Sequence, residues 1–202
     1  MRTDSAPGPD GFSPLFFKKN WDLVAPQLMQ LLTDFHNGTA KLQRINKAYL
    51  VLLPKKEPAL HPKDYRSISL QNCITKICTR GMTTRLQPFI PSLVHCDQIG
   101  FLKGRCIAEN FIYAADVVQA CHKRRAPSVA LKLDFRKAFD SVCWEALDDI
   151  LAAKGFPPRW RHWISLLNQS SQTAVVLNGV PGRWIQCKKG LRQLSLPLHH
   201  CG

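Results

Sequence analysis

Two aspartates that accompany a short apolar run are the residues best placed to do chemistry in this sequence. Asp134 lies at the end of the run 128–135, and Asp140 follows six residues later. An acid at the end of a strand can project from a sheet edge toward a ligand, and carboxylate oxygens are the donors that Mg²⁺ prefers. A single aspartate in such a place is also common as a helix cap. Asp140, directly before Ser141, is the better candidate for that structural role.

Lysine and arginine are the second group of candidate functional residues. The chain has 202 residues, with 28 Lys and Arg against 14 Asp and Glu, and a formal net charge of +14. No acid follows Asp149, whereas the segment 41–66 holds seven bases against Glu57 and Asp64. The seven are Lys41, Arg44, Lys47, Lys55, Lys56, Lys63 and Arg66. A basic excess of this kind favours a polyanionic partner, of which nucleic acid is the commonest.

Cysteines and apolar runs exclude several other classes of protein. The eight cysteines have irregular spacings without a C-x-x-C pair. Structural zinc sites usually have paired ligands on short knuckles, so we interpret the cysteines as reduced thiols of an intracellular protein. The alternative is a metal site formed by the three places where His and Cys are neighbours. No run approaches the ~18 apolar residues of a membrane span. The first residues lack the apolar core of a secretory signal. Nuclear and cytoplasmic locations both stay open.

The elements that must position the candidate residues follow from apolar periodicity and from helix breakers. A helical period starts at Ser13 and Pro14 and ends near Gly38, with Pro26 expected to break or kink it. In the first half of the chain, the same pattern also predicts a strand over 48–53, a loop over 55–66, a helix over 69–86, a turn region over 98–105 and a helix over 107–123.

The second half begins with the strand 128–135 that would carry Asp134. We expect Ser141 to cap a helix that runs to Ala153 and closes at Gly155, followed by a helix over 159–168. Asn178 and Gly179 separate two β-prone runs, 173–177 and 184–188, which is the strongest short-range signal for a hairpin. This order of helices and strands predicts an α+β fold.

A series of motifs appears in order between residues 7 and 193. The stretch 132–140 reads Lys-Leu-Asp-Phe-Arg-Lys-Ala-Phe-Asp. The other stretches are 7–12, 53–56, 64–70, 98–105 with Asn110, 155–157 with Trp160, Trp163 and Ile164, and 178–179 with 190–193. The first resembles motif A of reverse transcriptases from non-LTR (LINE-type) retrotransposons. The others resemble that family's opening fingers motif, its two further fingers motifs, its class-specific insertion, its palm helix and its approach to motif B.

The resemblance implies a right-hand polymerase with an α+β fold. It implies an irregular lead-in over 1–12, a fingers-like region over 13–126, a partial palm over 127–193, a divergent tail over 194–202 and no thumb. The activity implied is that of an RNA-directed DNA polymerase, which takes an RNA template, a DNA primer and deoxynucleoside triphosphates. In such enzymes two Mg²⁺ ions hold the reacting groups. The oligomeric state stays open.

The resemblance also implies a role for individual residues. Asp134 would be the catalytic residue and ligate both metal ions, and the backbone carbonyl of Phe135 would ligate one. Four residues would bind the nucleotide: Lys55 and Arg66 at the triphosphate, Phe139 beneath the sugar, and Gln193 near it. Lys56, Gly104 and Arg105 would contact the nucleic-acid backbone. Arg offers phosphate a planar fork and Lys a point charge; for Phe139, core packing is the alternative.

The chain departs from the family pattern in two places. Ser67 stands where the family usually has proline. After 190–193 the family continues with Gly-Asp-Pro and later with an aromatic-Ala-Asp-Asp turn, neither of which occurs in 194–202. Because a two-metal site needs several converging carboxylates, we expect a truncated fragment that is inactive alone. The alternatives are a non-catalytic RNA- or DNA-binding module and an unstable product of a decayed retrotransposon reading frame.

Overall fold

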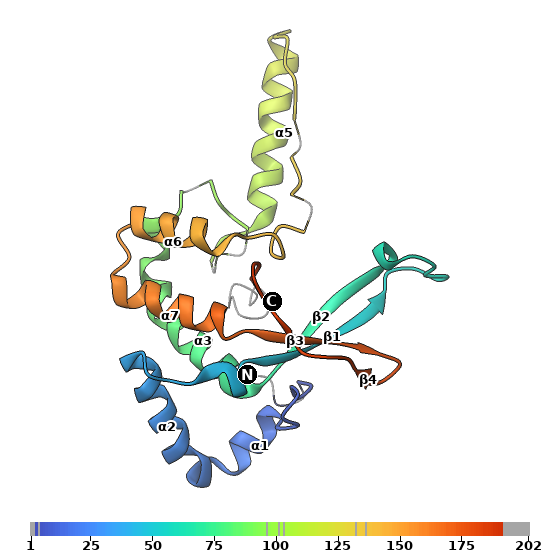
Figure 1. Cartoon of the computed structure of the whole chain (residues 1–202). Coiled ribbons are helices and arrows are strands. Elements are labelled where there is room, and N and C mark those ends of the chain that lie inside the picture. Colours follow the sequence, from blue (N-terminus) through green and yellow to red (C-terminus); the bar gives the residue numbers. More distant parts are fainter. Residues whose placement is uncertain are drawn as a thin grey trace.

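The computed structural model describes residues 3, 5–95, 97–100, 102, 104–131, 133–135 and 137–191. The helices are α1 (Pro14–Lys19), α2 (Trp21–Asn37), α3 (Cys73–Leu86), α4 (Ile90–Leu93), α5 (Ile107–Lys123), α6 (Trp144–Ala153) and α7 (Pro158–Gln169), with 3-10 turns at Leu42–Arg44, Pro62–Asp64 and Gln87–Phe89. The strands are β1 (Lys47–Pro54), β2 (Tyr65–Gln71), β3 (Gln172–Leu177), β4 (Val180–Pro181) and β5 (Ile185–Gln186). Helices and one sheet agree with the predicted α+β class (Figure 1).

One mixed sheet brings the two halves of the chain together. Its order is β2-β1-β3-β4, and β5 also pairs with β3. β1 and β2 are antiparallel, from Ala48 opposite Gln71 to Pro54 opposite Tyr65. β1 and β3 are parallel, with Tyr49 opposite Ala174. The β1–β2 hairpin therefore lies beside strands from the end of the described chain, with its loop projecting from the body (Figure 1).

The described core is small and lies where α2, α7 and the turn before β1 meet. Phe35, Leu42 and Trp163 are buried together, and the Phe35 and Trp163 ring centroids are 6.0 Å apart. The indole Nε1 of Trp163 donates to the His36 carbonyl at 3.1 Å, so the polar edge of this large ring is satisfied. Among the described residues, no helix has the length and apolar character needed to cross a membrane.

The lead-in over residues 5–12 is held against the start of α3. A Cβ on Gly8 would stand 2.4 Å from the Asn72 backbone nitrogen, so only glycine allows this approach. The Asn72 side chain accepts from the Asp10 N–H at 3.2 Å and donates to the Ile45 carbonyl at 3.0 Å. Burial raises the pKa of Asp10, while the hydrogen bond from the Phe12 N–H opposes that rise. The first family-like motif therefore has a structural anchor.

The predicted helix that starts at Ser13 consists of two helices. α1 starts as expected, with the Ser13 Oγ accepting from the Phe16 N–H at 3.3 Å. The break falls at Asn20, whose side chain donates to the Phe16 carbonyl at 2.9 Å and thus ends α1. Pro26 lies inside α2 without breaking it. The proline falls early in the helix, where the carbonyl it leaves unbonded is that of the exposed Asp22. α2 ends at Gly38, at a φ of 79°, as predicted.

The strand β2 corrects two expectations. Residues 55–66 do not all form a loop, and the helix predicted from Ser69 begins at Cys73. Arg66, Ile68 and Leu70 alternate with polar residues, and this period of two pairs with β1 along the whole strand. The sequence pattern does not reveal this strand, because Leu70 also fits the helical spacing of the residues that follow.

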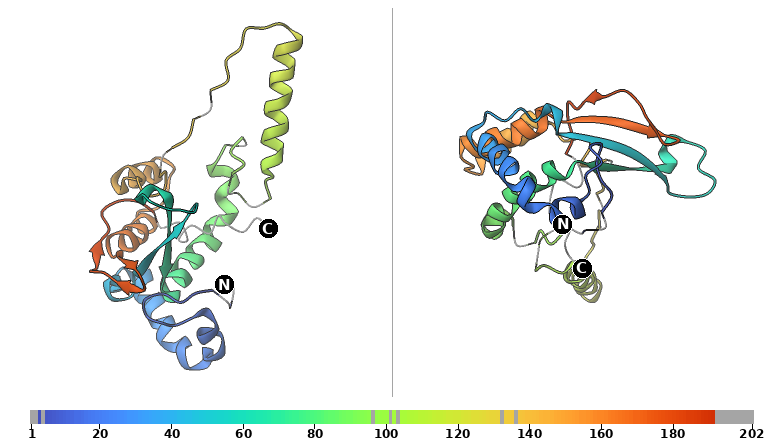
Figure 2. Two further views of the ribbon diagram at one scale, coloured as in Figure 1. Left: turned by 90° about the vertical axis from the view of Figure 1, so that its right-hand side faces the viewer. Right: turned by 90° about the horizontal axis from the view of Figure 1, so that it is seen from below.

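The strand predicted over 128–135 is absent from its described residues, 128–131 and 133–135. This segment returns from α5 toward α6 apart from the helix (Figure 2). Its apolar residues alternate, but Val129, Leu131, Leu133 and Phe135 are all largely exposed. A strand needs a partner for its backbone groups, and no described strand lies beside this one. The helix over 107–123 is confirmed as α5, which projects alone, with none of its residues buried.

The helices after motif A differ from expectation only at their start. α6 begins at Trp144 with Cys143 as its N-cap, so Ser141 is not the cap. The Ser141 N–H instead donates to the Lys137 carbonyl at 3.2 Å and closes a turn. α6 and α7 are joined by Arg161, whose Nε donates to Asp148 at 2.8 Å and whose hydrogen bond lowers the pKa of that carboxyl. The predicted helix over 159–168 is confirmed by α7.

The predicted hairpin is confirmed at its turn. Asn178 and Gly179 have φ of 50° and 80°, and Leu177 is opposite Val180 across a two-residue connection. The second strand, predicted over 184–188, is found as two short pieces: β4 lies directly after the turn, and β5 falls within the predicted range. The Gly182 N–H donates to the Val175 carbonyl at 2.8 Å, which keeps the break between these pieces against β3.

Candidate functional site

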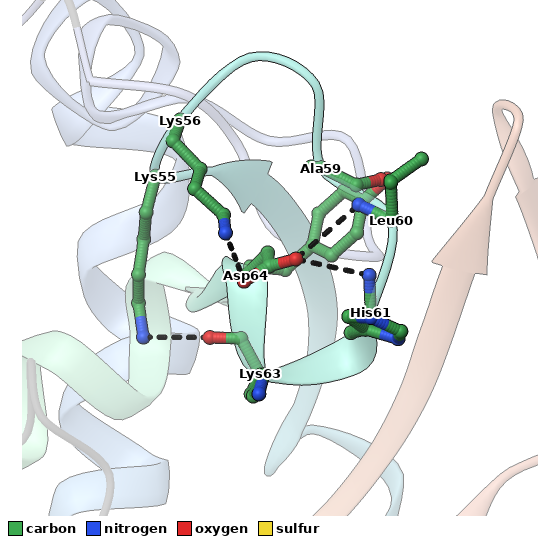
Figure 3. A network of polar contacts seen from close by, with 8 residues as sticks. Lys55, Lys56, Ala59, Leu60, His61, Lys63 and Asp64 are labelled. Carbon is green, nitrogen blue, oxygen red and sulfur yellow. Dashed lines mark hydrogen bonds and ion pairs between the residues drawn. The ribbon is translucent and has the colours of Figure 1, made fainter.

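The loop between β1 and β2 carries Lys55 and Lys56, two of the basic residues predicted to bind phosphate or nucleic acid (Figure 3). Asp64 is its anchor, with only 6% of its side chain exposed. Its Oδ2 accepts from the backbone N–H groups of Leu60, at 3.2 Å, and His61, at 3.0 Å. Its Oδ1 lies 3.1 Å from the Lys56 ammonium. A buried carboxylate with three partners fixes the loop, because losing any one would leave charge or a donor unmatched.

Lys55 and Lys56 of this loop and Arg66 of the adjoining strand β2 have different surroundings. The Lys55 ammonium donates to the Lys63 carbonyl at 3.1 Å and stays exposed, so it keeps two further protons for a ligand. Lys56 has its charge balanced by Asp64. Arg66 lies opposite Leu53 near the base of the loop, and it is exposed. The hairpin thus brings Lys55 and Arg66 to one end of the sheet.

Asp134 and Phe135, the two predicted metal ligands, lie on the surface of the molecule. Both are exposed on the segment that returns from α5. In the part of the chain that the structure describes, no three His, Cys, Asp or Glu side chains are grouped so that they could hold a metal ion. Among the described residues, Asp134 is therefore not part of such a group.

Phe139 lies in the turn at the end of the motif A stretch, and the approach to motif B packs beside it. The Leu191 N–H donates to the Phe139 carbonyl at 2.8 Å, and the Gly190 N–H donates to the Val142 carbonyl at 2.7 Å. The Trp144 indole donates to the Gly190 carbonyl at 2.8 Å. The two stretches predicted to contact the nucleotide are therefore brought together. Gln193 itself lies outside the described residues.

Gly104 and Arg105 lie in the predicted turn region before α5. Gly104 has a φ of 82°, which favours glycine. The Arg105 guanidinium donates through Nη1 to the carbonyls of His95, at 2.8 Å, and Gln98. The side chain predicted to contact a template backbone thus holds its own turn closed.

A cavity of about 230 Å³ lies between α3, α6, α7 and the segment at Gly190. Its lining mixes threonine hydroxyls of α3 with apolar side chains of α6 and α7, among them Thr79, Leu147 and Trp160. None of the described residues that were predicted to act on nucleotide or metal lines it. Of the β1–β2 hairpin, only Gln71 at the end of β2 away from the loop lines the cavity.

One aromatic pair on the sheet was missed in the sequence. Tyr49 of β1 and Trp184, next to β5, stack with ring centroids 5.8 Å apart and planes at 13°. The Lys47 ammonium lies 4.8 Å from the centroid of the Trp184 ring. Alternation along β1 predicts that Lys47 and Tyr49 lie on one face of the sheet, but no local sequence pattern indicates that Trp184 contacts them.

Comparison with known proteins agrees with the motifs. The profile of the family described as "Reverse transcriptase (RNA-dependent DNA polymerase)" matches residues 53–193. The chain is 29% identical over 194 residues to the transposon TX1 uncharacterized 149 kDa protein of Xenopus laevis, covering 96% of this chain and 15% of that protein.

Two further relatives are polyproteins of retrotransposable elements. The identity is 27% over 201 residues to the Retrovirus-related Pol polyprotein from type-1 retrotransposable element R2 of Nasonia vitripennis, covering 98% of this chain and 19% of the relative. The identity is 27% over 191 residues to the corresponding polyprotein from type-2 retrotransposable element R2DM of Drosophila melanogaster, covering 94% of this chain and 17% of the relative. The chain thus spans less than a fifth of the length of these relatives. With the profile match over most of its length, the chain belongs to the reverse transcriptase family, among those of non-LTR (LINE-type) retrotransposons.

Proposed function

We propose that this chain supplies the nucleotide-gripping and strand-guiding part of an RNA-directed DNA polymerase. The observation that carries the proposal is the basic β1–β2 loop, in which buried Asp64 binds two backbone N–H groups and the Lys56 ammonium. Lys55 and Arg66 at this loop would bind the triphosphate, with the ammonium as a point charge and the guanidinium as a planar fork. Residues 13–126 would be the fingers-like region and 127–193 a partial palm, after a lead-in over 1–12 and before a divergent tail over 194–202.

The remaining assignments concern the sugar, the strand and the metal ions. Phe139 would lie beneath the incoming sugar with Gln193 near it, and Lys56, Gly104 and Arg105 would contact the template strand. Asp134 and the Phe135 carbonyl would bind Mg²⁺. Reverse transcriptases use divalent metal ions, and a two-metal site needs carboxylates from more than one element. The described residues do not fit such a site on their own, so we assign this chain binding of nucleotide and strand, without polymerisation by itself.

Nucleotide binding tests the proposal directly. The probe is a fluorescent deoxynucleoside triphosphate titrated with the purified chain. Because hydrogen bonds to charged groups contribute about 1.5–3 kcal/mol, Lys55→Ala and Arg66→Ala should each weaken binding about tenfold or more. Lys18→Ala, which removes an exposed charge on α1, is the matched control. Unchanged binding in both variants would contradict the assignment of the hairpin.

Primer extension on an RNA template tests the second half of the proposal. With Mg²⁺ or Mn²⁺ we expect no incorporation by this chain alone. Incorporation that Asp134→Ala abolishes would show that the chain polymerises by itself and would overturn this assignment.

A non-catalytic RNA- or DNA-binding module is the second candidate, and the net charge of +14 favours it. Such a module would bind single-stranded RNA with a steep salt dependence, because phosphate contacts release counterions. It would show no response to Lys55→Ala or Arg66→Ala in the triphosphate titration. These two results together separate it from the polymerase part.

A further inference from the structure

We propose that a single-stranded nucleic acid lies along one face of the sheet and stacks one of its bases on Trp184. The proposal rests on the proposed function, since it names how the strand would be held. We call this surface the Tyr49 face; it consists of Lys47, Tyr49, Val51 and Leu53 of β1, Arg66, Ile68 and Leu70 of β2, Ala174 and Val176 of β3, and Trp184.

The strand register defines the Tyr49 face. Alternate residues of β1 point to the same side of the sheet, and residues directly opposite one another share a side. Arg66 is opposite Leu53, and Ala174 is opposite Tyr49. Thr173 is opposite Ile185, which places Trp184 across from Ala174. Tyr49, Ala174 and Trp184 therefore form a row across three neighbouring segments.

The small side chain in the middle of this row explains the stack. Ala174 is fully buried, and it leaves room for the Trp184 indole to reach the Tyr49 ring. Trp184 nevertheless keeps 39% of its surface exposed. An indole that is backed by a second ring and still reaches solvent is ordered before any ligand arrives, so binding would cost little conformational entropy.

The charges around the Trp184 ring favour a polyanion. Lys47 lies at one end of the Tyr49 face, and Arg66 lies near the other end. Arg66 is opposite Leu53, which is six residues from Lys47 along β1. At about 3.3 Å per residue this separation is ~20 Å, the length of about six nucleotides at a rise of ~3.4 Å. None of the described strands contains Asp or Glu, and Arg183 precedes Trp184 directly. Phosphates along this face would therefore meet cations, and the strands themselves offer no competing carboxylate.

The stacking surface selects a single strand over a duplex. Every base has a π face that can lie on an aromatic ring, but in a duplex both faces are already covered by neighbouring base pairs. The attraction between the Lys47 ammonium and an indole that reaches solvent is weak, so the ammonium can turn from the ring to a phosphate. The base would then take the place that Lys47 occupies beside the ring.

The experiment measures fluorescence anisotropy of end-labelled twelve-nucleotide oligo(U), oligo(dT) and a blunt duplex of equal length. Trp184→Ala should weaken binding of both single strands by about fivefold to a hundredfold, the range for one stacked base. Trp184→Phe should retain most of the affinity, and the duplex should respond to neither. Trp21→Ala is the matched control, because Trp21 is an exposed tryptophan on α2 with 49% of its surface accessible.

A second measurement keeps the test independent of whether Trp184→Ala folds. A single strand carrying 5-iodouridine is irradiated on the unmodified chain, and the crosslinked peptides are sequenced by mass spectrometry. Trypsin would release the tryptophan within the peptide 184–188, which is distinct from peptides of the other tryptophans. We expect crosslinks in this peptide. Crosslinks only elsewhere, or a folded Trp184→Ala variant with wild-type affinity, would overturn the inference.

The outcomes also separate this inference from the proposed function. If the wild-type chain binds no single strand at any salt concentration, strand binding fails in both. If it binds and neither Trp184 nor its peptide takes part, only the stacking site fails. A loss on Trp184→Ala that extends equally to the duplex would show general damage to the sheet and would also count against a stacked base.

Discussion

Gly190 lies against the main chain of Asp140 with no space for a side chain. A Cβ on Gly190 would stand 2.7 Å from the Asp140 carbonyl oxygen, and the φ of Gly190 is +83°. The hydrogen bonds from Gly190 to Val142 and from Leu191 to Phe139 hold the same two stretches together. The approach to motif B therefore meets the end of motif A through backbone contacts that only glycine permits.

The first prediction concerns this contact. Gly190→Ala should lower the free energy of unfolding by about 2 kcal/mol or more, because it adds a clash to the cost of a left-handed alanine. Urea unfolding followed by tryptophan fluorescence measures it. Gly81→Ala is the control, since Gly81 lies inside α3 and a Cβ there would meet nothing within 4 Å, and it should stabilise by about 0.5–1 kcal/mol. A wild-type midpoint for Gly190→Ala would contradict the packing described.

The second prediction concerns the anchor of the basic loop. Asp64→Ala removes the acceptor of the Leu60 and His61 N–H groups and the partner of Lys56. Leaving such groups unmatched should cost about 1–3 kcal/mol, measured by denaturant unfolding. Hydrogen exchange should also accelerate across residues 55–64. Glu57→Ala, an exposed acid of the same loop, should change neither quantity; equal effects from both substitutions would show that burial of Asp64 is unimportant.

The third prediction concerns thiol reactivity. Burial raises the pKa of Cys78 to about 11 and also raises the pKa of Cys73, whereas Cys106 and Cys143 are exposed. At pH 8 the two buried thiols are protonated, and the thiolate is the reactive form. Pulsed alkylation with mass spectrometry should therefore modify Cys106 and Cys143 first, and Cys73 and Cys78 only after urea is added. Early labelling of Cys78 would contradict its burial.

The same thiol gives a direction for stability against pH. The folded pKa of Cys78 is raised above its ordinary value of 9.0, so the unfolded chain loses this proton at a lower pH than the folded chain. The contribution of the protonated Cys78 thiol to the free energy of unfolding is complete below pH 9.0 and is lost as the pH rises toward about 11. Urea unfolding curves recorded at a series of pH values give the free energy of unfolding against pH. Cys78→Ser should reduce the fall of this free energy at alkaline pH, and an unchanged fall would count against the effect.

The fourth prediction concerns the projecting arm, which we define as α5 with the segment 128–135. Phe111 and Leu131 are 73% and 79% exposed there, and large exposed apolar side chains of this kind favour association between molecules. The double substitution Phe111→Lys and Leu131→Lys should reduce concentration-dependent association in sedimentation velocity. It should leave the unfolding midpoint unchanged, because neither side chain is buried. Equal association of both forms would show that the arm is not the adhesive surface.

Elements governed by local chemistry could be predicted from the sequence. The end of α2 at Gly38 and the turn at Asn178 and Gly179 follow from residues that accept positive φ, and the bounds of α5 follow from helical periodicity. The segment 128–135 has the right alternation for a strand, yet pairing depends on a partner elsewhere in the fold. A sequence pattern indicates the preference and does not supply the partner.

The candidate site shows the same division. Motif spacing drew attention to Lys55 and Arg66, but the strand register that brings them to one end of the sheet depends on β2, which the helical spacing of Leu70 obscured. Asp64 was counted among the charges of the loop, although its burial makes it the loop's anchor. The stack of Tyr49 with Trp184 depends on the parallel pairing of β1 with β3, and residues so far apart in the chain leave no local trace.

The parallel pairing of β1 with β3 has a consequence for synthesis on the ribosome. A parallel pair needs a crossover connection, and here the chain between β1 and β3 contains α3 to α7. The β1–β2 hairpin leaves the exit tunnel long before β3, so one edge of β1 waits with unpaired backbone groups while most of the chain is translated. Such an edge can pair with another nascent chain. The yield of folded protein should therefore depend on translation speed and on chaperones that cover β1 during this interval.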